Sequence, residues 1–397
     1  MKLVRTIAQN GLRLLVLPVV VVFYLLRKFV TVEFVLPNVT LFGHLALEPE
    51  KILSKIESER RSASSPSRRL LIWSLGKPRN QVNKALVKIW RRELRVLPAT
   101  IVDAMHRTSR WLPNFEMKIM QFDKLHENDH VLDACQPHLK FNKSEVQIGE
   151  QYLARVGIKP GEPYICLIVR EAAWAPPTTG PLSSGALRSR EFQEFLPAAR
   201  ALTELGVSVI KLGAAGTSRA DGTEVIDYAN SSDKSEFLDV FLPAHATCVI
   251  STMSGPDAVA LAGRVPVLYI DIAQYSLCFA GTGLVTWVPA RLYSQKLGRV
   301  MSLAEVFESG AGRFLGASAF EQAGISIEQS TPEQIRDYSL DFYKRLNAPN
   351  SNNERMQSLY RAKFHSLLSK NSVAKLAPFN SSLSGLFLDK HGEDFLA

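Results

Sequence analysis

The sequence is poor in cysteine, with four residues in 397, at positions 135, 166, 248 and 278. Four scattered cysteines exclude a small secreted scaffold held by disulfides and indicate reduced thiols in a cytosolic compartment. Long hydrophobic runs are also missing: the longest, residues 14–26, has 13 residues, against roughly 20 needed to span a bilayer. With 46% apolar and 21% charged residues, the chain is neither mostly disordered nor a polytopic membrane protein.

Several catalytic motifs are absent. The chain has no GxxxxGK[ST], no HExxH and no GxSxG, which argues against a P-loop nucleotidase, a zinc protease of that type and a serine hydrolase. It also has no Asp-x-Asp pair to hold a metal diphosphate. The spacing of His126, His130, Cys135 and His138 resembles a metal cluster, but the segment fits a polar loop between domains equally well. We expect neither a metal site nor a cofactor.

Positive charge is concentrated in one half of the chain. Residues 1–113 contain 20 Lys/Arg and 7 Asp/Glu, a net of +13, which leaves −4 for residues 114–397. A basic half indicates an anionic partner, either nucleic acid or a membrane surface. Because no zinc-finger spacing, aromatic RNA-binding strand or helix-turn-helix pattern is present, we expect no nucleic-acid partner and favour an anionic membrane surface.

The N-terminal residues 1–28 are expected to associate with a membrane. The apolar run at 14–26 is flanked by Lys2, Arg5 and Arg13 on one side and by Arg27 and Lys28 on the other, and it contains Pro18. A short run with cations at both ends predicts a shallow or re-entrant anchor, peripheral or monotopic, on the cytoplasmic face of the inner membrane. A short true span and a buried helix of the soluble domain are the alternatives.

Strand and helix patterns alternate along the rest of the chain. Residues 29–144 read as strand 29–36, helix 45–56 and strand 70–75, followed by a basic helix. Residues 145–347 read as strands at 164–169, 207–212, 247–251 and 266–271, with helices at 191–205, 235–245 and 254–262 between them. This alternation predicts two α/β, Rossmann-like domains with parallel sheets. Residues 348–397 are expected to form a polar C-terminal tail.

Polar side chains gather where the predicted strands of the second domain end, the edge at which such sheets bind ligands. Ser254 and Gly255, at a strand-to-helix junction, would offer amide groups to a phosphate, and arginines would add bidentate contacts. Taken singly, Ser254 is also a plausible helix cap and Arg170 a plausible structural ion pair. The set predicts a diphosphate site and comprises Arg170, Glu171, Arg188, Lys211, Gly213, Ser254, Gly255 and Asp257.

Short motifs in the chain resemble a bacterial family of glycosyltransferases found in surface-polysaccharide gene clusters. They are FGHLALEPE at 42–50, VREAAW at 169–174, RSREF at 188–192, IKLG at 210–213, VIDYANSSDKSEFLDVFL at 225–242 and ISTMSGPDAVALAGRVPV at 250–267. The family is GT-B-like, so the resemblance implies two Rossmann-like domains facing across a cleft. It also implies a nucleotide-sugar site in the C-terminal domain that needs no metal.

The resemblance further implies roles for single residues. Arg170, Arg188 and Lys211 would face the diphosphate, Asp227 and Tyr228 would belong to the donor site, and Gly43-His44 would lie nearest the acceptor. His44 is the candidate catalytic base, because a near-neutral imidazole suits that task; a packing role in its loop is the alternative. Glu171 and Arg188-Ser189-Arg190 depart from the Asp and Arg-Asn expected at these places.

The sequence therefore predicts a metal-independent glycosyltransferase. It would move a sugar from a nucleotide-sugar donor to a lipid-linked or polysaccharide acceptor in surface polysaccharide synthesis. Two rivals stay open: another transferase on the same fold, such as a pyruvyl or fucosyl transferase, and a membrane-associated scaffold without chemistry.

Overall fold

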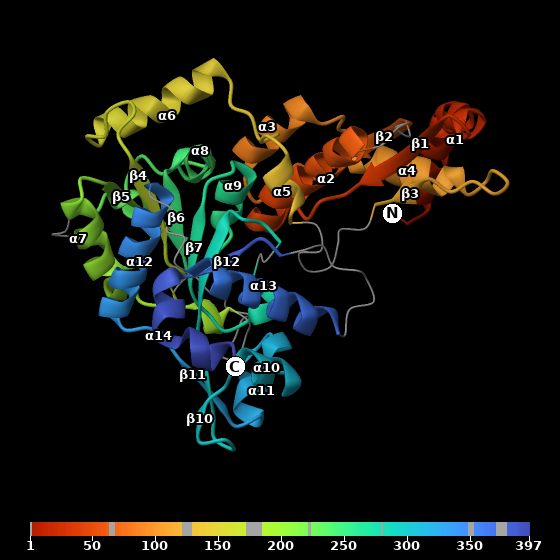
Figure 1. Ribbon diagram of the computed structural model, residues 1–397. Coiled ribbons are helices and arrows are strands. Elements are labelled where there is room, and N and C mark those ends of the chain that lie inside the picture. Colours follow the sequence, from red (N-terminus) through yellow and green to blue (C-terminus); the bar gives the residue numbers. More distant parts are fainter. Residues whose placement is uncertain are drawn as a thin grey trace. The chain divides into compact units, whose positions relative to one another are not determined.

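The computed structural model describes residues 2–62, 68–120, 129–171, 185–220, 224–278, 281–347, 353–370 and 379–397. The chain divides into two compact units (Figure 1). The first unit comprises residues 1–122 and 138–140, and the second comprises residues 123–137 and 141–397. All four cysteines are buried free thiols, as their scattered positions predict.

The first unit is a three-stranded parallel sheet with helices. Its elements are α1 (Lys2–Leu26), β1 (Val30–Val35), α2 (Phe42–Ser62), β2 (Arg68–Trp73), α3 (Lys84–Glu93), α4 (Ala99–Ser109) and β3 (Lys118–Ile119). The strand order is β2-β1-β3, and Val30 to Val35 pair in register with Arg68 to Trp73. The strands predicted at 29–36 and 70–75 are confirmed, and the helix predicted at 45–56 is longer at both ends.

The expected N-terminal segment is a helix of the first unit. Val16 and Val20 of α1 are buried in one core with Val32 and Phe34 of β1 and with Met105 of α4. Residues 1–28 therefore do not stand apart from the unit, because one side of α1 covers its sheet. Within the described residues, no helix is both long enough and apolar enough to cross a bilayer.

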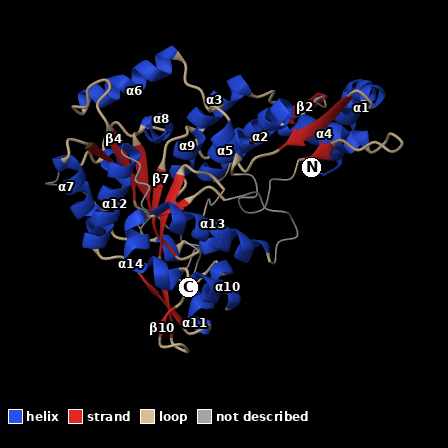
Figure 2. Cartoon of the chain, viewed as in Figure 1, coloured by secondary structure: helices blue, strands red, loops and turns tan. Residues whose placement is uncertain are grey.

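The second unit is built on a six-stranded parallel sheet (Figure 2). Its first elements are α5 (Val131–Ala134), α6 (Lys143–Arg155), β4 (Tyr164–Ile168), α7 (Leu196–Glu204), β5 (Ser208–Leu212), α8 (Leu238–His245), β6 (Cys248–Ser251), α9 (Asp257–Ala262), β7 (Val267–Ile272) and β8 (Val285–Pro289). Every residue of β4, β6 and β7 is buried, so both faces of the sheet are covered, as in doubly wound folds. The predicted strands of this domain are confirmed.

A small antiparallel sheet adds a feature that the sequence patterns did not indicate. It has the order β10-β9-β11, formed by β9 (Arg291–Ser294), β10 (Arg299–Val300) and β11 (Ile325–Glu328), with α10 (Leu303–Glu308) and α11 (Ala317–Gln322) between the last two strands. Its strands are only two to four residues long, too short to show a clear period.

The expected polar tail is instead part of the second unit where the structure describes it. After α12 (Pro332–Asn347), the chain forms α13 (Glu354–Ser369), β12 (Ser382–Leu383) and α14 (Gly385–Phe395). Strand β12 extends the large sheet beside β8, and the Tyr360 hydroxyl accepts a hydrogen bond of 2.8 Å from Trp287 Nε1. Buried aromatic side chains therefore hold this segment in place.

The order of the large sheet marks one position for a ligand. In the strand order β12-β8-β7-β6-β4-β5, β5 lies on one side of β4, and the later strands β6, β7 and β8 lie on the other side. The chain therefore reverses its direction of winding between β4 and β6. In open α/β sheets, ligands bind outside the carboxyl ends of the strands at this switch point.

Candidate functional site

The loops that follow β4 and β6 are joined at the switch point. The backbone N–H of Arg170, two residues after β4, donates to the Thr252 hydroxyl after β6 at 2.9 Å. The chain then returns, and the N–H of Arg190 donates to the Arg170 carbonyl at 2.9 Å. Arg188 Nη1 donates to the carbonyl of Met253 at 3.0 Å. The structure thus brings the predicted residues Arg170 and Arg188 to one place.

Two cations close together make this place electropositive. Burial lowers the pKa of Arg170, and the neighbouring Arg188 cation lowers it further. Burial also lowers the pKa of Arg188, while Asp257 acts in the opposite direction. Arg188 Nε is buried and has no hydrogen-bond partner within the described part of the chain. A buried guanidinium donor beside a second guanidinium suits an anion that can accept from both.

The Ser254–Gly255 junction is arranged differently from the prediction. The N–H of Ser254 donates to Asp257 Oδ2 at 2.5 Å, and the hydroxyl of Ser251 donates to the same oxygen at 2.8 Å. The expected free amide at Ser254 is therefore taken by the chain's own carboxylate. Gly255 contributes its carbonyl, which accepts from the Ala258 N–H at 3.3 Å. The Ser254 amide is thus engaged within the chain, whereas Arg188 keeps a buried donor without a partner among the described residues.

Asp257, which interacts with the Arg188 cation, is unusual for a carboxylate because it is buried. Burial raises its pKa to about 6, although hydrogen bonds from Ser254 and Ser251 act against the shift. Beside it, Met253 has φ +65°, a left-handed conformation that non-glycine residues rarely adopt. Such strain is typical of functional sites. The Met253 N–H donates to the Ser251 hydroxyl at 3.0 Å, and the sequence carried no signal for this conformation.

Lys211 and Glu171 lie inside the protein and contact each other. Lys211 Nζ is 3.5 Å from Glu171 Oε2, donates to the carbonyl of Ser218, and lies 4.3 Å from the centre of the Phe192 ring. Glu171 Oε1 accepts from the Ser218 N–H at 3.0 Å. In this structure the pair fastens the loop after β5, and the side chain of Lys211 is satisfied there rather than offered to a diphosphate.

The other predicted donor-site residues build the same loop region. Asp227 accepts from the Ala220 N–H at 3.1 Å and from Asn230 Nδ2 at 2.9 Å. Tyr228 is fully buried, and its hydroxyl donates to Asp239 Oδ1 at 3.0 Å. Gly213 lies directly after β5 and has room for a Cβ at ordinary contact distances. These three residues shape the loop and are not brought together with the arginine pair by any hydrogen bond among described residues.

Arg190, two residues from Arg188, forms structural ion pairs with Asp271 and Glu194. It is buried between Asp271 and Glu194, and its Nε donates to Glu194 Oε2 at 2.6 Å. Asp271 has φ +56° and also accepts from the Ser330 hydroxyl at 2.6 Å. Arg188 and Arg190, two residues apart in one motif, thus have different surroundings: Arg190 is paired with two carboxylates, and Arg188 keeps an unused buried donor among the described residues.

His44 lies in the first turn of α2 in the first unit and has a carboxylate partner. His44 Nδ1 is 2.7 Å from Glu48 Oε1, and the hydrogen bond to Glu48 raises the pKa of the imidazole. Glu48 is itself held, since its Oε2 accepts from the Asn38 N–H at 2.8 Å. The side chain of His44 is 53% exposed, so its second nitrogen can meet a substrate. Glu48 was not predicted as a site residue, although its position four residues after His44 in a helix would have indicated the contact.

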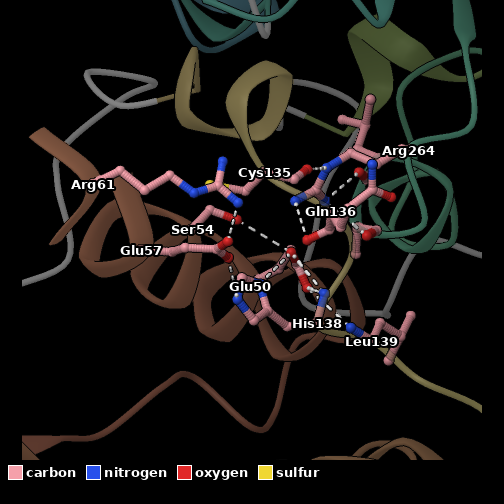
Figure 3. A network of polar contacts seen from close by, with 11 residues as sticks. Glu50, Ser54, Glu57, Arg61, Cys135, Gln136, His138, Leu139 and Arg264 are labelled. Atoms are coloured by element: carbon pink, nitrogen blue, oxygen red, sulfur yellow. Dashed lines mark hydrogen bonds and ion pairs between the residues drawn. The ribbon is translucent and has the colours of Figure 1, made fainter. Parts of the chain in front are cut away.

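The His/Cys-rich segment joins the two units without forming a metal cluster among the described residues; His126 lies outside them. His138 belongs to the first unit, where Glu50 of α2 accepts from its N–H at 3.0 Å and from the Leu139 N–H at 3.1 Å (Figure 3). In the second unit, Arg264 Nε donates to the Cys135 carbonyl at 3.0 Å. These contacts fix backbone on each side of residue 137.

Comparison with known proteins gives matches among solved structures only. No family model matches the chain, and no curated protein matches it. A family 9 glycosyl transferase from Veillonella parvula is 11% identical over 65% of this chain and 86% of its own, with a TM-score of 0.42. The E. coli ADP-heptose lipopolysaccharide heptosyltransferase II is 10% identical over 65% and 90%, with a TM-score of 0.39. The wall teichoic acid polymerase TagF is 11% identical over 62% and 72%, with a TM-score of 0.26.

The similar structures are thus glycosyltransferases, but the likeness is weak. Identities of 14% or less and TM-scores of 0.42 or less leave the functional argument to the chain's own residues. What this chain shows by itself is a mixed α/β fold with parallel sheets in both units. The predicted cleft between the domains stays a prediction.

Proposed function

We propose that the chain is a glycosyltransferase that moves a sugar from a nucleotide-sugar donor to a lipid-linked or polysaccharide acceptor. The observation that supports it most is the pair Arg170 and Arg188 at the β4–β6 switch point. Two neighbouring guanidinium groups, one with an unused buried donor, suit the two phosphates of a nucleoside diphosphate.

In the proposed reaction, the bond between the anomeric carbon and the diphosphate oxygen breaks, and a bond to the acceptor hydroxyl oxygen forms. The leaving nucleoside diphosphate gains negative charge, which Arg170 and Arg188 would stabilise. Each such contact contributes about 2–4 kcal/mol where it acts only in the transition state. These cations would do the work that a metal does in other transferases, so the proposal is metal-independent.

The acceptor hydroxyl must lose a proton, and the proposal assigns this proton to His44. Its Nδ1 is engaged by Glu48 at 2.7 Å, which leaves Nε2 to take the proton. The Glu48 carboxylate would stabilise the imidazolium that results, because it already raises the pKa of the ring. Glu48 is a positioning residue in this scheme, since it acts through His44.

The surface-polysaccharide role, the lipid-linked acceptor and a place on the cytoplasmic face of the inner membrane complete the proposal. The basic first unit supports them: it carries 22 Lys/Arg and 8 Asp/Glu, a formal net charge of +14. A strongly basic surface suits an acceptor that carries a lipid diphosphate.

The test is a panel of UDP, GDP, ADP, dTDP and CMP measured by calorimetry. We expect one nucleotide to bind and its sugar conjugate to be turned over. Arg170→Ala and Arg188→Ala should each weaken the binding about 10- to 100-fold, because hydrogen bonds to charged groups contribute roughly 1.5–3 kcal/mol. Arg200→Ala, at an exposed position of α7, is the matched control and should bind as the unaltered chain does.

Three outcomes of these measurements would contradict the proposed function. Equal affinities in Arg170→Ala, Arg188→Ala and Arg200→Ala would remove the arginine pair from the site. Binding without turnover of any donor would favour the scaffold, and turnover of a different activated group would favour another transferase on this fold.

A further inference from the structure

Helix α1 has apolar side chains on two opposite sides, but only one side is buried. Val16 and Val20 point into the core of the first unit, at 9% and 0% exposed. On the other side, Leu14 is 62% exposed, Leu15 77% and Leu25 65%. A helix that is hydrophobic all round normally has both sides covered. The outer side of α1 therefore faces something other than the first unit.

The exposed residues follow helical spacing along one side. Positions separated by three or four residues lie on the same side of a helix, and the exposed positions of α1 continue in this way from the first residue of the run, Leu14, to its last, Leu26. We call this side the outer stripe; it consists of Leu14, Leu15, Pro18, Val19, Val22, Leu25 and Leu26. It contains no charged residue and extends about 18 Å at 1.5 Å per residue.

Cations stand at both ends of the outer stripe. Arg13 precedes it, and the exposed Arg27 and Lys28 follow it. The guanidinium of Arg27 lies 3.9 Å from the centre of the Tyr24 ring and donates to the Tyr24 carbonyl at 2.7 Å. An apolar stripe bounded by arginine, lysine and tyrosine is the arrangement of helices that lie in the interface of a bilayer.

Charge decides between the two occupants that could cover the stripe. A second copy of the chain would bring another first unit with a net charge of +14, and the two would repel each other. An anionic bilayer surface attracts the same charge and accepts the apolar side chains. Since no described helix is suited to cross a bilayer, the helix would lie in the surface.

We propose that the outer stripe of α1 docks the first unit on an anionic bilayer, with α1 in the plane of the interface and Val16 and Val20 still in the protein core. This inference deepens the proposed membrane location and rests on it. It does not depend on the transferase assignment, because it involves none of the residues of the arginine pair.

The experiment is flotation of the full chain with vesicles of phosphatidylcholine, with and without phosphatidylglycerol. We expect binding to the anionic vesicles that falls as salt rises, since exposed charges are then screened. The double variant Leu15→Glu/Val22→Glu should lose at least about tenfold in vesicle affinity, because charged side chains oppose entry into the interface. Leu359→Glu is the matched control, an exposed leucine on helix α13, 44% exposed, and should float normally.

Two results would overturn the inference. Undiminished flotation of the double variant would place membrane binding elsewhere. A dimer seen by light scattering, absent in Leu15→Glu/Val22→Glu, together with no vesicle binding, would assign the stripe to a second copy. Urea unfolding of the same samples reports that the variants fold, and because it needs no nucleotide it keeps this result separate from the transferase test.

Discussion

Lys211 Nζ and the Glu171 carboxylate lie 3.5 Å apart, with side chains 1% and 4% exposed. A cation at a strand end of a doubly wound sheet is naturally interpreted as a phosphate ligand, and the position of Lys211 favoured that interpretation. The structure gives it another partner, and the loop after β5 depends on the pair because Ser218 bonds to both residues. The position of a cation in the sequence therefore does not reveal which anion it meets.

Lys211→Met should destabilise the chain by about 3–5 kcal/mol, because Glu171 would be left as an uncompensated buried charge. Adding Glu171→Gln should recover much of that loss, as measured by urea unfolding of both variants. If Lys211 contacted the diphosphate, the double variant would also bind nucleotide as poorly as Arg170→Ala. We expect its nucleotide affinity to change by no more than about threefold, less than one hydrogen bond to a charged group contributes.

Glu48→Gln should move the pH–rate profile. The hydrogen bond to Glu48 raises the pKa of His44, so the base is protonated and idle up to a higher pH than usual. Removing the carboxylate charge lowers that pKa, and the acid limb of the rate should shift to lower pH while the maximal rate falls. His44→Gln should abolish the limb, whereas His391→Gln should keep it. An unmoved limb in Glu48→Gln would show that another group titrates.

The His44–Glu48 pair also makes a small, pH-dependent contribution to the stability of the folded state. A histidine whose pKa is raised in the folded state stabilises it at pH below the unfolded value near 6.5, and this gain is lost as pH rises through the folded value. Because His44 is half exposed, solvent screening limits the gain to about 0.5 kcal/mol. The kinetic shift is therefore the better measurement.

Glu50→Ala should cost about 3 kcal/mol of unfolding free energy. Glu50 is fully buried, and the change leaves the amide groups of His138 and Leu139 without their acceptor. Hydrogen exchange should show faster exchange at residues 138–140 than in the unaltered chain. Glu57→Ala is the comparison, since Glu57 accepts from no backbone amide of this stretch: it contacts the His138 ring, at 3.1 Å, and the Arg61 side chain, and it is partly exposed. Equal losses in the two variants would contradict a special role for Glu50.

Much of the fold was open to prediction because it depends on local patterns. Runs such as Tyr164–Ile168 and Val267–Ile272 are apolar throughout, and strands buried on both faces must be so. The small sheet around Arg291–Ser294 was missed because its strands are too short to show a period. Residues 348–397 were taken for a polar tail, since buried aromatic residues such as Tyr360 and Phe364 are separated by polar ones in the sequence.

The site was predicted only in part. That Arg170 and Arg188 lie close together could be predicted, because residues at the carboxyl ends of parallel strands meet at one edge. The uses of Arg190 and of the Ser254 amide could not be read from the sequence. Both depend on distant carboxylates, Asp271 and Asp257, whose positions follow from tertiary packing.

The strap at residues 138–140 has a practical consequence for dividing this protein. The chain passes from the first unit into the second at residue 123. Residues 138–140 belong to the first unit again, and from residue 141 onward the chain belongs to the second unit. A fragment ending at residue 122 would lack the amides of His138 and Leu139 that donate to Glu50, so no single cut separates the two units completely. A fragment that keeps the whole first unit must extend through residue 140 and therefore carries residues 123–137 of the second unit with it.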